Sequence, residues 1–533
     1  MKHPFRPFTK LFRYNRPGRP LQVPPADGPE APAPEDSLSP RIQDSLRAMN
    51  AVFHYPKNAD YVVRELLLGE RRCAVLHIDG MTSRTDLEDF VLRPMQQAAP
   101  LTAKGEALAQ ELLDRVLPTG TGKTETDPRK IAQFILGGNF AVLLDGCPEA
   151  VLCEMQGFSR RGVEQPVTET VIMGPHQAFN ENMRTNLSLL RRILKTPDLV
   201  DELFYVGKKA QNPLAICYME SIANPALVEE VKRRVQGIES DVVYTSGELA
   251  QLIEDKTFAL LPQLLLTERP DRAASFLMDG MVLLVYDNSP YAIAAPATLA
   301  AFLHSGEDTS LRWQYGLFIR LIRTLGMLVA LFLPAVYNAL LLYHQELLPA
   351  ELLTSLLEGH AMVPFSVTAE LLLMEFTFNL INEASLRMPG HMGSTLGIIG
   401  ALVLGQAAVS ANLISPALII IVSIAGLGTF ALPNYPMSIA LRIRRICYIL
   451  ASAFFGFTGI AALVTLFLFC DCALESFGVP FFAPFAPKMP HNPDLFLRLP
   501  LYMQRMTPPM FRPKQRVRST APRGWDPQEG KLP

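Results

Sequence analysis

Uncharged apolar residues are concentrated in the second half of the chain. Residues 394–433 contain no Lys, Arg, Asp or Glu, and residues 316–344 and 446–470 are further apolar segments of spanning length. A helix crosses a bilayer with about 20 mostly apolar residues, so the first of these stretches has the length for two crossings. The pattern predicts an all-α, multi-pass membrane domain over residues 316–470.

Another segment of this half, residues 361–386, has spanning length but carries acidic side chains. One stripe of a helix here would hold four polar residues: Thr368, Glu375, Asn379 and Asn382. One interpretation is an interfacial helix, or a helix packed under the bundle. The other is a helix that lines a wet path, where intramembrane carboxylates attract cations. The residues alone leave both open.

Small and polar residues recur inside the uncharged stretch 394–433. Small residues let helices approach closely in lipid, and polar residues there need a partner. The segment 361–386 is therefore the better candidate for a pore lining, with 394–433 as its close-packed neighbour. The candidate pore or coupling residues are Thr368, Glu375, Asn379, Asn382, Glu383, Gln406, Ser410 and Asn412.

Residues 41 to about 300 show a different pattern, in which short apolar strands alternate with helical segments. Residues 71–79 predict a strand from their alternating, β-branched content, and a helix-like segment follows. Residues 139–155 predict a hairpin, because two apolar runs flank Asp145-Gly146, a favoured tight-turn pair. This part of the chain is expected to be soluble and α/β.

The same order of elements recurs about 141 residues later. The repeat aligns 61–69 with 199–207, 74–80 with 214–221, 139–155 with 278–296, Asp79 with Glu220, and Asp145 with Asp287. We infer two duplicated α/β subdomains, over 41–156 and 176–300, joined by a linker at 157–175. The alternative is a chance similarity of short α/β patterns. A cleft between two such lobes could bind a small ligand, and a structural pedestal fits the pattern equally well.

A polar helix is predicted between the two subdomains, within residues 174–199, and Pro197 should end it. Its apolar residues have helical spacing, which favours a solvated helix docked between the lobes. The functional alternative is an interface or coupling helix. The candidate interface residues, between subunits or between lobes, are Asn182, Arg184, Asn186, Arg191 and Arg192.

Composition limits the classes of function. Hydrophobic residues make up 49% of the chain and the net charge is −2, so the chain as a whole does not have the charge of a nucleic-acid binder. The seven cysteines form no CxxC pair, which predicts neither a disulfide framework nor a metal site and fits a reducing compartment. No GxSxG, HExxH or phosphate-loop motif occurs, so we expect no enzyme and no cofactor.

Basic residues give conflicting signals about membrane topology. Residues 1–40 form a basic, Pro-rich segment that is expected to be disordered, and no cleavable signal peptide is expected. The basic tail at 488–533 is also expected to be disordered. Three basic segments should prefer the cytoplasm: Arg320 with Arg323, the run 442–445, and this tail. These preferences leave the number of crossings open between four and five, with the soluble region on the cytoplasmic side.

Four separated motifs occur in a fixed order around the membrane half. They are GPHQAFNENMRTNLSLLRRIL from residue 174, TERPD at 267–271, NEASLRMPGHMGSTLGIIGALVLGQAAVSANLISP from residue 382, and FGVPFFAPFAP at 477–487. Together they resemble the A subunit of GerA-type spore germination receptors. The likeness runs from about residue 45 to 490.

The resemblance implies a subunit of a nutrient germinant receptor in the spore inner membrane. It implies partner B and C subunits, and homo-oligomers that form or gate an ion channel. Contact with membrane lipid is expected from the residues themselves, since the basic cluster in residues 1–20 can touch anionic headgroups; a solvated tail is the alternative. Two departures from the family pattern remove charges that a coupling salt bridge would use. His176 and Gln177 stand where the family has Arg-Glu, and Asn382 stands in place of an Arg. Met388 also replaces a Leu.

The leading hypothesis from the sequence is a receptor and ion-conduction subunit that triggers spore germination. The alternatives are a small-molecule or ion transporter subunit, or a non-conducting membrane scaffold. A transporter should show inverted repeats in its membrane half, whereas the repeat found here lies in the soluble half.

Overall fold

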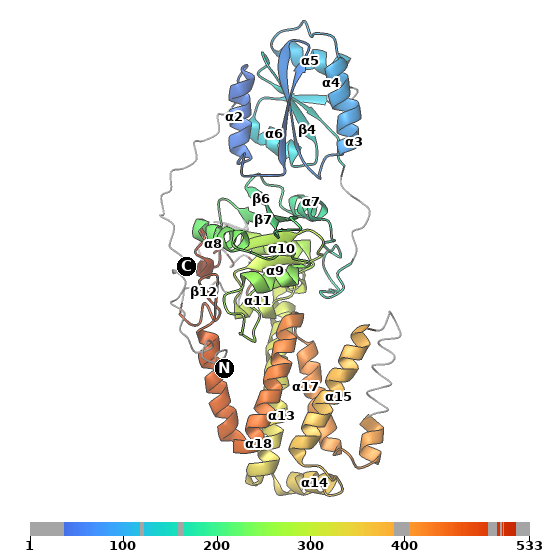
Figure 1. Cartoon of the computed structure of the whole chain (residues 1–533), viewed down its shortest axis with the longest axis vertical. Helices are drawn as coiled ribbons and strands as arrows, with labels where there is room; N and C mark the ends of the chain where they lie inside the picture. Colours follow the sequence, from blue (N-terminus) through green and yellow to red (C-terminus); the bar gives the residue numbers. More distant parts are fainter. Residues whose placement is uncertain are drawn as a thin grey trace.

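The chain forms three bodies that follow one another along its long axis (Figure 1). We call them lobe 1 (residues 37–157), lobe 2 (residues 176–303) and the helical region (residues 313–472). The computed structural model describes residues 37–117, 122–157, 165–387, 405–488, 498–501, 504 and 506–518. The predicted disordered segment up to residue 36, and the part of the predicted helix pair at 394–404, lie outside these residues.

Lobe 1 is a five-stranded antiparallel sheet with helices on both faces. Its strands lie in the order β1-β2-β4-β5-β3. The helices α2 and α6 cover one face, and α3 to α5 cover the other. The bounds are α2 Ile42–Val52, β1 Tyr61–Leu68, β2 Arg71–Ile78, α3 Arg84–Leu87, a π-helical turn Glu88–Leu92, α4 Arg93–Gln97, α5 Glu106–Arg115, β3 Gly122–Glu125, α6 Pro128–Ile135, β4 Phe140–Leu144 and β5 Ala150–Cys153.

Lobe 2 has the same strand order, β6-β7-β9-β10-β8, as the sequence repeat predicts. Its hairpin β9–β10 corresponds to β4–β5, and both are antiparallel. The bounds are α7 Met183–Ile193, β6 Leu199–Val206, β7 Asn212–Met219, α8 Pro225–Gln236, α9 Ser246–Ile253, β8 Leu265–Thr267, α10 Pro270–Met278, β9 Val282–Tyr286, β10 Ala292–Ala295 and α11 Leu299–Leu303.

The repeated aspartates of the two hairpins have the same structural role. Asp145 accepts a hydrogen bond from the backbone N–H of Ile42 at 3.2 Å, and Asp287 accepts one from Met183 at 3.0 Å. Each aspartate therefore caps the first helix of its own lobe, where backbone donors have no intrahelical partner. The alignment of Asp145 with Asp287 thus reflects one repeated contact.

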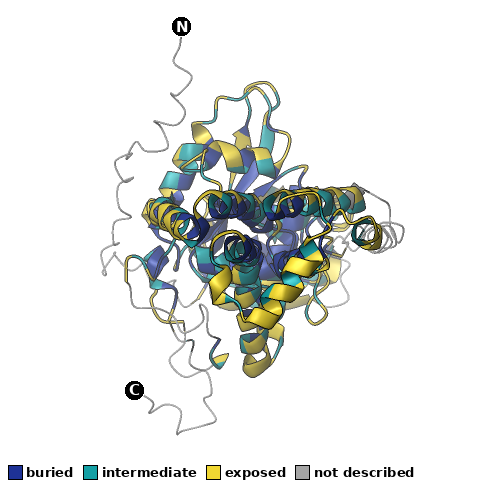
Figure 2. Ribbon diagram, turned by 90° about the horizontal axis from the view of Figure 1, so that it is seen from below, coloured by how far each residue is buried: buried dark blue, intermediate teal, exposed yellow. Residues whose placement is uncertain are grey.

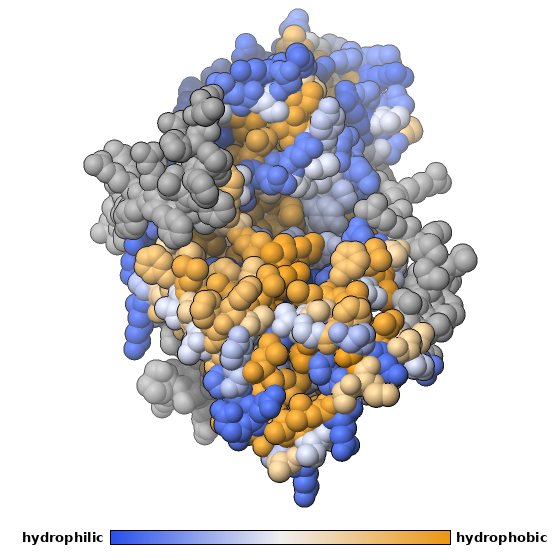
Figure 3. All heavy atoms as spheres, turned by 60° about the horizontal axis from the view of Figure 1, so that its bottom comes forward, coloured by the Kyte–Doolittle hydropathy of each residue, from blue (hydrophilic) through white to orange (hydrophobic). Residues whose placement is uncertain are grey.

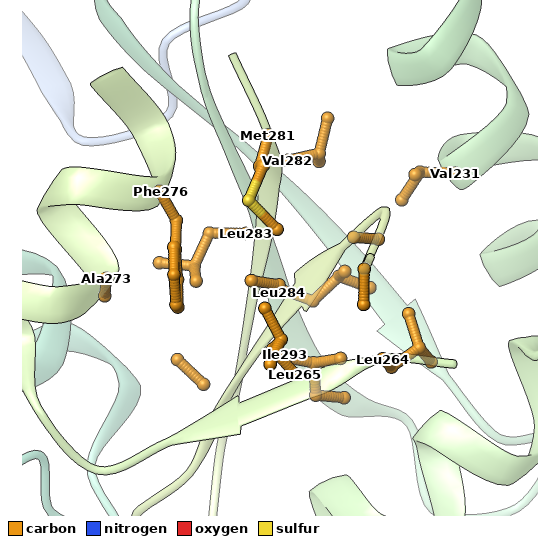
Figure 4. Packing of buried hydrophobic residues seen from close by; sticks show 14 of the residues in the cluster. Val231, Leu264, Leu265, Ala273, Phe276, Met281, Val282, Leu283, Leu284 and Ile293 are labelled. Carbon is orange, nitrogen blue, oxygen red and sulfur yellow. The ribbon is translucent and has the colours of Figure 1, made fainter. Parts of the chain in front are cut away.

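The core of lobe 2 is built by side-chain alternation along β9. Leu283 lies toward Phe276 of α10, whereas Val282 and Leu284 lie on the face of Val231 (Figure 4). Successive strand residues point to opposite faces, so one buried strand fills both layers of core. Each buried side chain of this size contributes roughly 1.5–3 kcal/mol to folding.

Among the described residues of the helical region, α13 and the helical stretch α18 are long and apolar enough to cross a membrane. The helix α17 is apolar but shorter. Seen from below, the helices carry their buried residues on their inner sides (Figure 2), and apolar residues gather on the outer surface (Figure 3). The bounds are α12 Glu307–Ser310, α13 Trp313–Tyr343, α14 Ala350–His360, α15 Val367–Arg387, α17 Pro416–Phe430 and α18 Tyr435–Cys472, with residues 405–410 also helical.

The predicted single span at 446–470 is wrong, because the chain reverses direction within α18. Gly456 has φ 57° and ψ −138°, outside the helical range. Arg444 pairs with Asp471 at 2.5 Å, although 27 residues of straight helix would separate them by about 40 Å. The two parts of α18, residues 435–455 and 457–472, are therefore antiparallel legs of a helical hairpin.

The end of the described chain returns to lobe 2. The short strands β11 Glu475–Ser476 and β12 Val479–Pro480 follow α18. Apolar residues of this part join the core of lobe 2, among them Phe477, Phe481, Met510 and Phe511. The prediction that the tail from residue 488 is disordered is therefore wrong for residues 506–518, because two of these apolar residues are buried there. Leu38 is likewise buried, so lobe 1 begins before residue 41.

Candidate functional site

The helix α7 lies at the junction of the two lobes, and its Arg191 is fully buried there. The guanidinium donates from Nε and Nη2 to both oxygens of Asp60 in lobe 1, at 2.7 and 2.8 Å. It also donates to Asp201 of β6 at 2.7 Å and to the Leu199 carbonyl at 2.7 Å. One arginine of lobe 2 thus holds a strand of its own lobe and the start of β1 in lobe 1.

This cluster holds two acidic groups, Asp60 and Asp201, and one basic group, Arg191, so its charges do not balance when both acids are ionised. Burial, together with the neighbouring Asp60 carboxylate, raises the pKa of Asp201 well above its usual value. The same two carboxylates raise the pKa of Arg191 against the opposing effect of burial. The arrangement favours a retained proton on Asp201, since one cation cannot balance two buried carboxylates.

Two further ion pairs cross the junction from equivalent positions of the repeat. Arg184 of α7 pairs with Asp79 at the end of β2. Lys57 of lobe 1 pairs with Glu220, which follows β7, at 3.9 Å. The strand-end carboxylates that the repeat aligns therefore each reach across to the other lobe.

The other predicted α7 residues have local roles or lie on the surface. Asn182 caps the helix by accepting from the Thr185 N–H at 3.0 Å. Asn186 is buried and donates to the Asn180 carbonyl at 2.6 Å. Arg192 lies on the exposed side of α7. The structure thus brings Arg184 and Arg191 into direct contact with lobe 1 through ion pairs with Asp79 and Asp60.

The TERPD motif clamps the segment that joins the lobes. Glu268 accepts from the backbone N–H of Val167 at 2.7 Å and from the Thr168 hydroxyl at 2.6 Å. Thr267 donates to Glu169 at 2.5 Å. Arg272, directly after the motif, also pairs with Glu169. The motif therefore fixes the path of residues 165–174 across lobe 2.

A buried ion pair joins three elements inside the helical region. Arg445 of α18 donates to Glu375 of α15 at 2.7 Å, and each side chain is 1% exposed. Arg445 also donates to the Thr429 hydroxyl of α17 at 3.2 Å. Glu375, a predicted pore residue, therefore lies between packed helices and opposite a cation.

A second polar layer lies farther from lobe 2. The Asn338 amide of α13 donates to the Ser452 hydroxyl at 2.9 Å and accepts from Thr368 at 3.0 Å. Nearby Glu370 is completely buried, accepts from the Ser415 N–H at 2.9 Å and lies 2.6 Å from His360 Nδ1. The Asn338 contacts join α13, α15 and α18. The Glu370 contacts join α14, α15 and the start of α17.

The remaining predicted pore residues do not gather into one site. Asn379 donates to the Glu375 carbonyl at 2.8 Å, and Asn382, in its favoured amide orientation, accepts from Arg442 at 2.7 Å. Glu383 lies on the exposed side of α15. The last three, Gln406, Ser410 and Asn412, are exposed in or after the helical turn at 405–410.

Sequence reasoning missed the cations that complete these clusters. The run 442–445 was expected to face the cytoplasm, yet Arg444 and Arg445 are buried ion-pair partners. Arg320 and Arg323 are also buried, and both contact Asp308. The sequence did contain a signal for these pairs. It places an acidic residue in one apolar segment and a basic residue in another, and charges inside a membrane are usually paired.

Comparison with known proteins gives consistent relatives. The family described as "Bacillus/Clostridium GerA spore germination protein" matches residues 48–510 of this chain. The chain is 34% identical over 465 residues to "Spore germination protein KA" of Bacillus subtilis, covering 86% of this chain and 85% of the relative. It is 32% identical over 473 residues to "Uncharacterized membrane protein YfkQ" of the same organism, covering 88% and 91%.

A solved structure also matches the first half of the chain. It is the crystal structure of the N-terminal domain of the A subunit of the Bacillus megaterium spore germinant receptor GerK3. The match has a TM-score of 0.39 and 25% sequence identity, and it covers 49% of this chain and 97% of that one. The matched family covers most of this chain, which therefore belongs to the Bacillus/Clostridium GerA spore germination protein family.

Proposed function

We propose that this chain is the A subunit of a nutrient germinant receptor and acts in spore germination. The family that matches residues 48–510 and the relative "Spore germination protein KA" carry germination names, which supports this role. The proposed location is the spore inner membrane, which the chain crosses several times with its lobes in the cytoplasm. The proposed partners are the B and C subunits of the receptor, further copies of this chain and membrane lipid.

Within that role, we propose that homo-oligomers form or gate an ion path along α15. The observation that carries this proposal is the buried Glu375–Arg445 pair between apolar helices. A buried ion pair adds little stability relative to apolar residues of the same volume. A role in opening or ordering the helices would therefore explain why the chain has such a pair here. The pair would release or position the polar stripe that contains Asn379 and Asn382.

A non-conducting scaffold is the second candidate, and one observation favours it. The exposed side of α15 carries Leu373, Phe376 and Leu380, while Glu375 is covered by Arg445. In a single copy of the chain, the carboxylate therefore contacts packed helices. Only assembly or a conformational change would then bring the stripe to water.

The test is germinant-triggered cation release from spores that carry Glu375→Gln or Arg445→Gln. Glu351→Gln, on the exposed side of α14, is the matched control. Both ion-pair variants should slow release while the control behaves as the parent, with protein amounts verified by immunoblot. Unchanged release in both variants would remove the pair from the conduction mechanism.

Subunit counting on purified, reconstituted protein separates the candidates. A closed ring with an axial opening supports the channel. A monomer with a pocket at the middle of the membrane supports transport, and an assembly without a central opening supports the scaffold.

A further inference from the structure

The linker segment at residues 165–174 exposes apolar side chains close to a held part of its backbone. Ile172 is 87% exposed and Met173 54% exposed. Glu268 holds Val167 and Thr168 through part-buried hydrogen bonds, and Arg272 pairs with Glu169. Neighbouring apolar side chains that are both exposed are typical of a contact surface.

The segment lies beside the start of the first predicted span. A Cβ added to Gly174 would lie 3.3 Å from the Ser310 hydroxyl, so the end of the segment lies close to α12. In turn, Asp308 of α12 binds Arg320 and Arg323 of α13. Figure 1 shows the segment between the body of lobe 2 and the upper ends of the helices. The segment therefore lies near the beginning of α13.

The first residues of α13 have the character of a membrane interface. Trp313 and Tyr315 are exposed at its beginning, and Phe318 follows on the outer surface with 64% exposure. Trp and Tyr are enriched at the headgroup level of membranes, where a ring can be half apolar and half wet. Ile172 and Met173 lie near this level, because Gly174 directly after them is close to Ser310, three residues before Trp313.

We propose that Ile172 and Met173 insert into the lipid headgroup layer beside Trp313 and Tyr315. The linker between the lobes is then a membrane-surface contact, and the TERPD motif holds residues 167–169 shortly before it. This inference rests on the proposed crossing of a membrane by α13. The competing occupant of the patch is a second protein chain, and the experiment below includes it as an outcome.

The test uses tryptophan as a depth reporter, because the chain holds only two: Trp313 and Trp525. Trp525→Phe leaves Trp313 as the reporter of the span. Ile172→Trp with both native tryptophans replaced by Phe reports on the linker. Leu67→Trp on the same background is the control, since it is exposed on β1 of lobe 1. Each full-length variant is reconstituted into phosphatidylcholine–phosphatidylglycerol vesicles that contain headgroup-nitroxide lipid.

Trp313 and the tryptophan at 172 should lose most of their emission, and the control should keep its emission. Quenching of Trp313 without quenching at 172 would overturn the surface contact and leave the crossing intact. Absence of quenching at both would overturn the proposed crossing itself. Unquenched, blue-shifted emission at 172 that grows with the protein-to-lipid ratio would assign the patch to a second protein chain, against the proposal.

Discussion

Single buried residues decide how the two lobes are joined. Arg191 donates from Nε and Nη2 to both oxygens of Asp60, from Nη2 also to Asp201, and from Nη1 to the Leu199 carbonyl. Because this guanidinium is buried, its removal leaves two buried carboxyl groups without their cation. The periodicity of α7 predicted a helix, but its arginines could not be sorted, since one of them faces lobe 1 only after both lobes have folded.

Arg191→Met should lower the free energy of unfolding by about 3–5 kcal/mol, the usual cost of removing one partner of a buried pair. Lys195→Met, at an exposed position just after the same helix, should change it by no more than about 0.5 kcal/mol. Urea unfolding of detergent-solubilised protein, followed by far-UV circular dichroism, measures the free energy of unfolding of both variants. Equal stability of the two variants would mean that the cluster does not hold the lobes together.

The raised pKa of Asp201 predicts a pH dependence with a definite sign. A carboxyl whose pKa is higher in the folded state binds more protons there than in the unfolded chain. Its contribution to stability is therefore present below the ordinary Asp pKa of about 4 and falls as pH rises toward the folded value. In thermal unfolding at a series of pH values, Asp201→Asn should flatten this decline. A decline as steep as in the parent would assign it to other groups.

At the scale of elements, the sequence predicted strands and hairpins well and helical turns poorly. The hairpins at 139–155 and 278–296 follow from tight-turn residues between apolar runs, which are local signals. The reversal of α18 has no such signal. Gly456 lies in a long apolar run, and in the folded chain its turn lies close to Tyr343 and His344. Tertiary packing therefore decided what composition could not.

Gly456→Val should destabilise the helical hairpin by about 1–3 kcal/mol, because φ 57° strains a β-branched residue. The added Cβ would also lie 3.1 Å from the His344 ring. Gly405→Ala is the matched control, since nothing lies within 4 Å of a Cβ at that position. The midpoint of heat-induced aggregation in detergent compares them; a control that is as unstable as Gly456→Val would contradict the assignment of the turn.

For the whole molecule, the reversal in α18 reconciles the conflicting topology signals. Its second leg ends beside lobe 2, where Lys256 donates to the Ala473 carbonyl and Lys514 pairs with Glu220. Residues 506–518 and lobe 2 must then lie on one side of any membrane that the helices cross. Charge counting alone could not give this result, because the buried Arg444 and Arg445 had been assigned to water.

Cysteine accessibility tests this arrangement on a background with the seven native cysteines replaced. Glu65→Cys in lobe 1 and Gln515→Cys near the chain end should react with an impermeant maleimide from the same side of sealed vesicles. Leu357→Cys, exposed on α14, should react from the opposite side. Reaction of positions 65 and 515 from different sides would overturn the shared side.

The return of the chain to lobe 2 also has a mechanical consequence. The helical region leaves that lobe through α12 and α13 and rejoins it through β11, where Ser476 donates to the Gln263 carbonyl at 2.6 Å. A body attached at one point can swivel freely, whereas a body attached at two points can only tilt about the line between them. A movement of lobe 2 is therefore expected to tilt the helical region about the line that joins these two connections. The buried ion pairs of Asp308 and Asp471 lie next to the two connections.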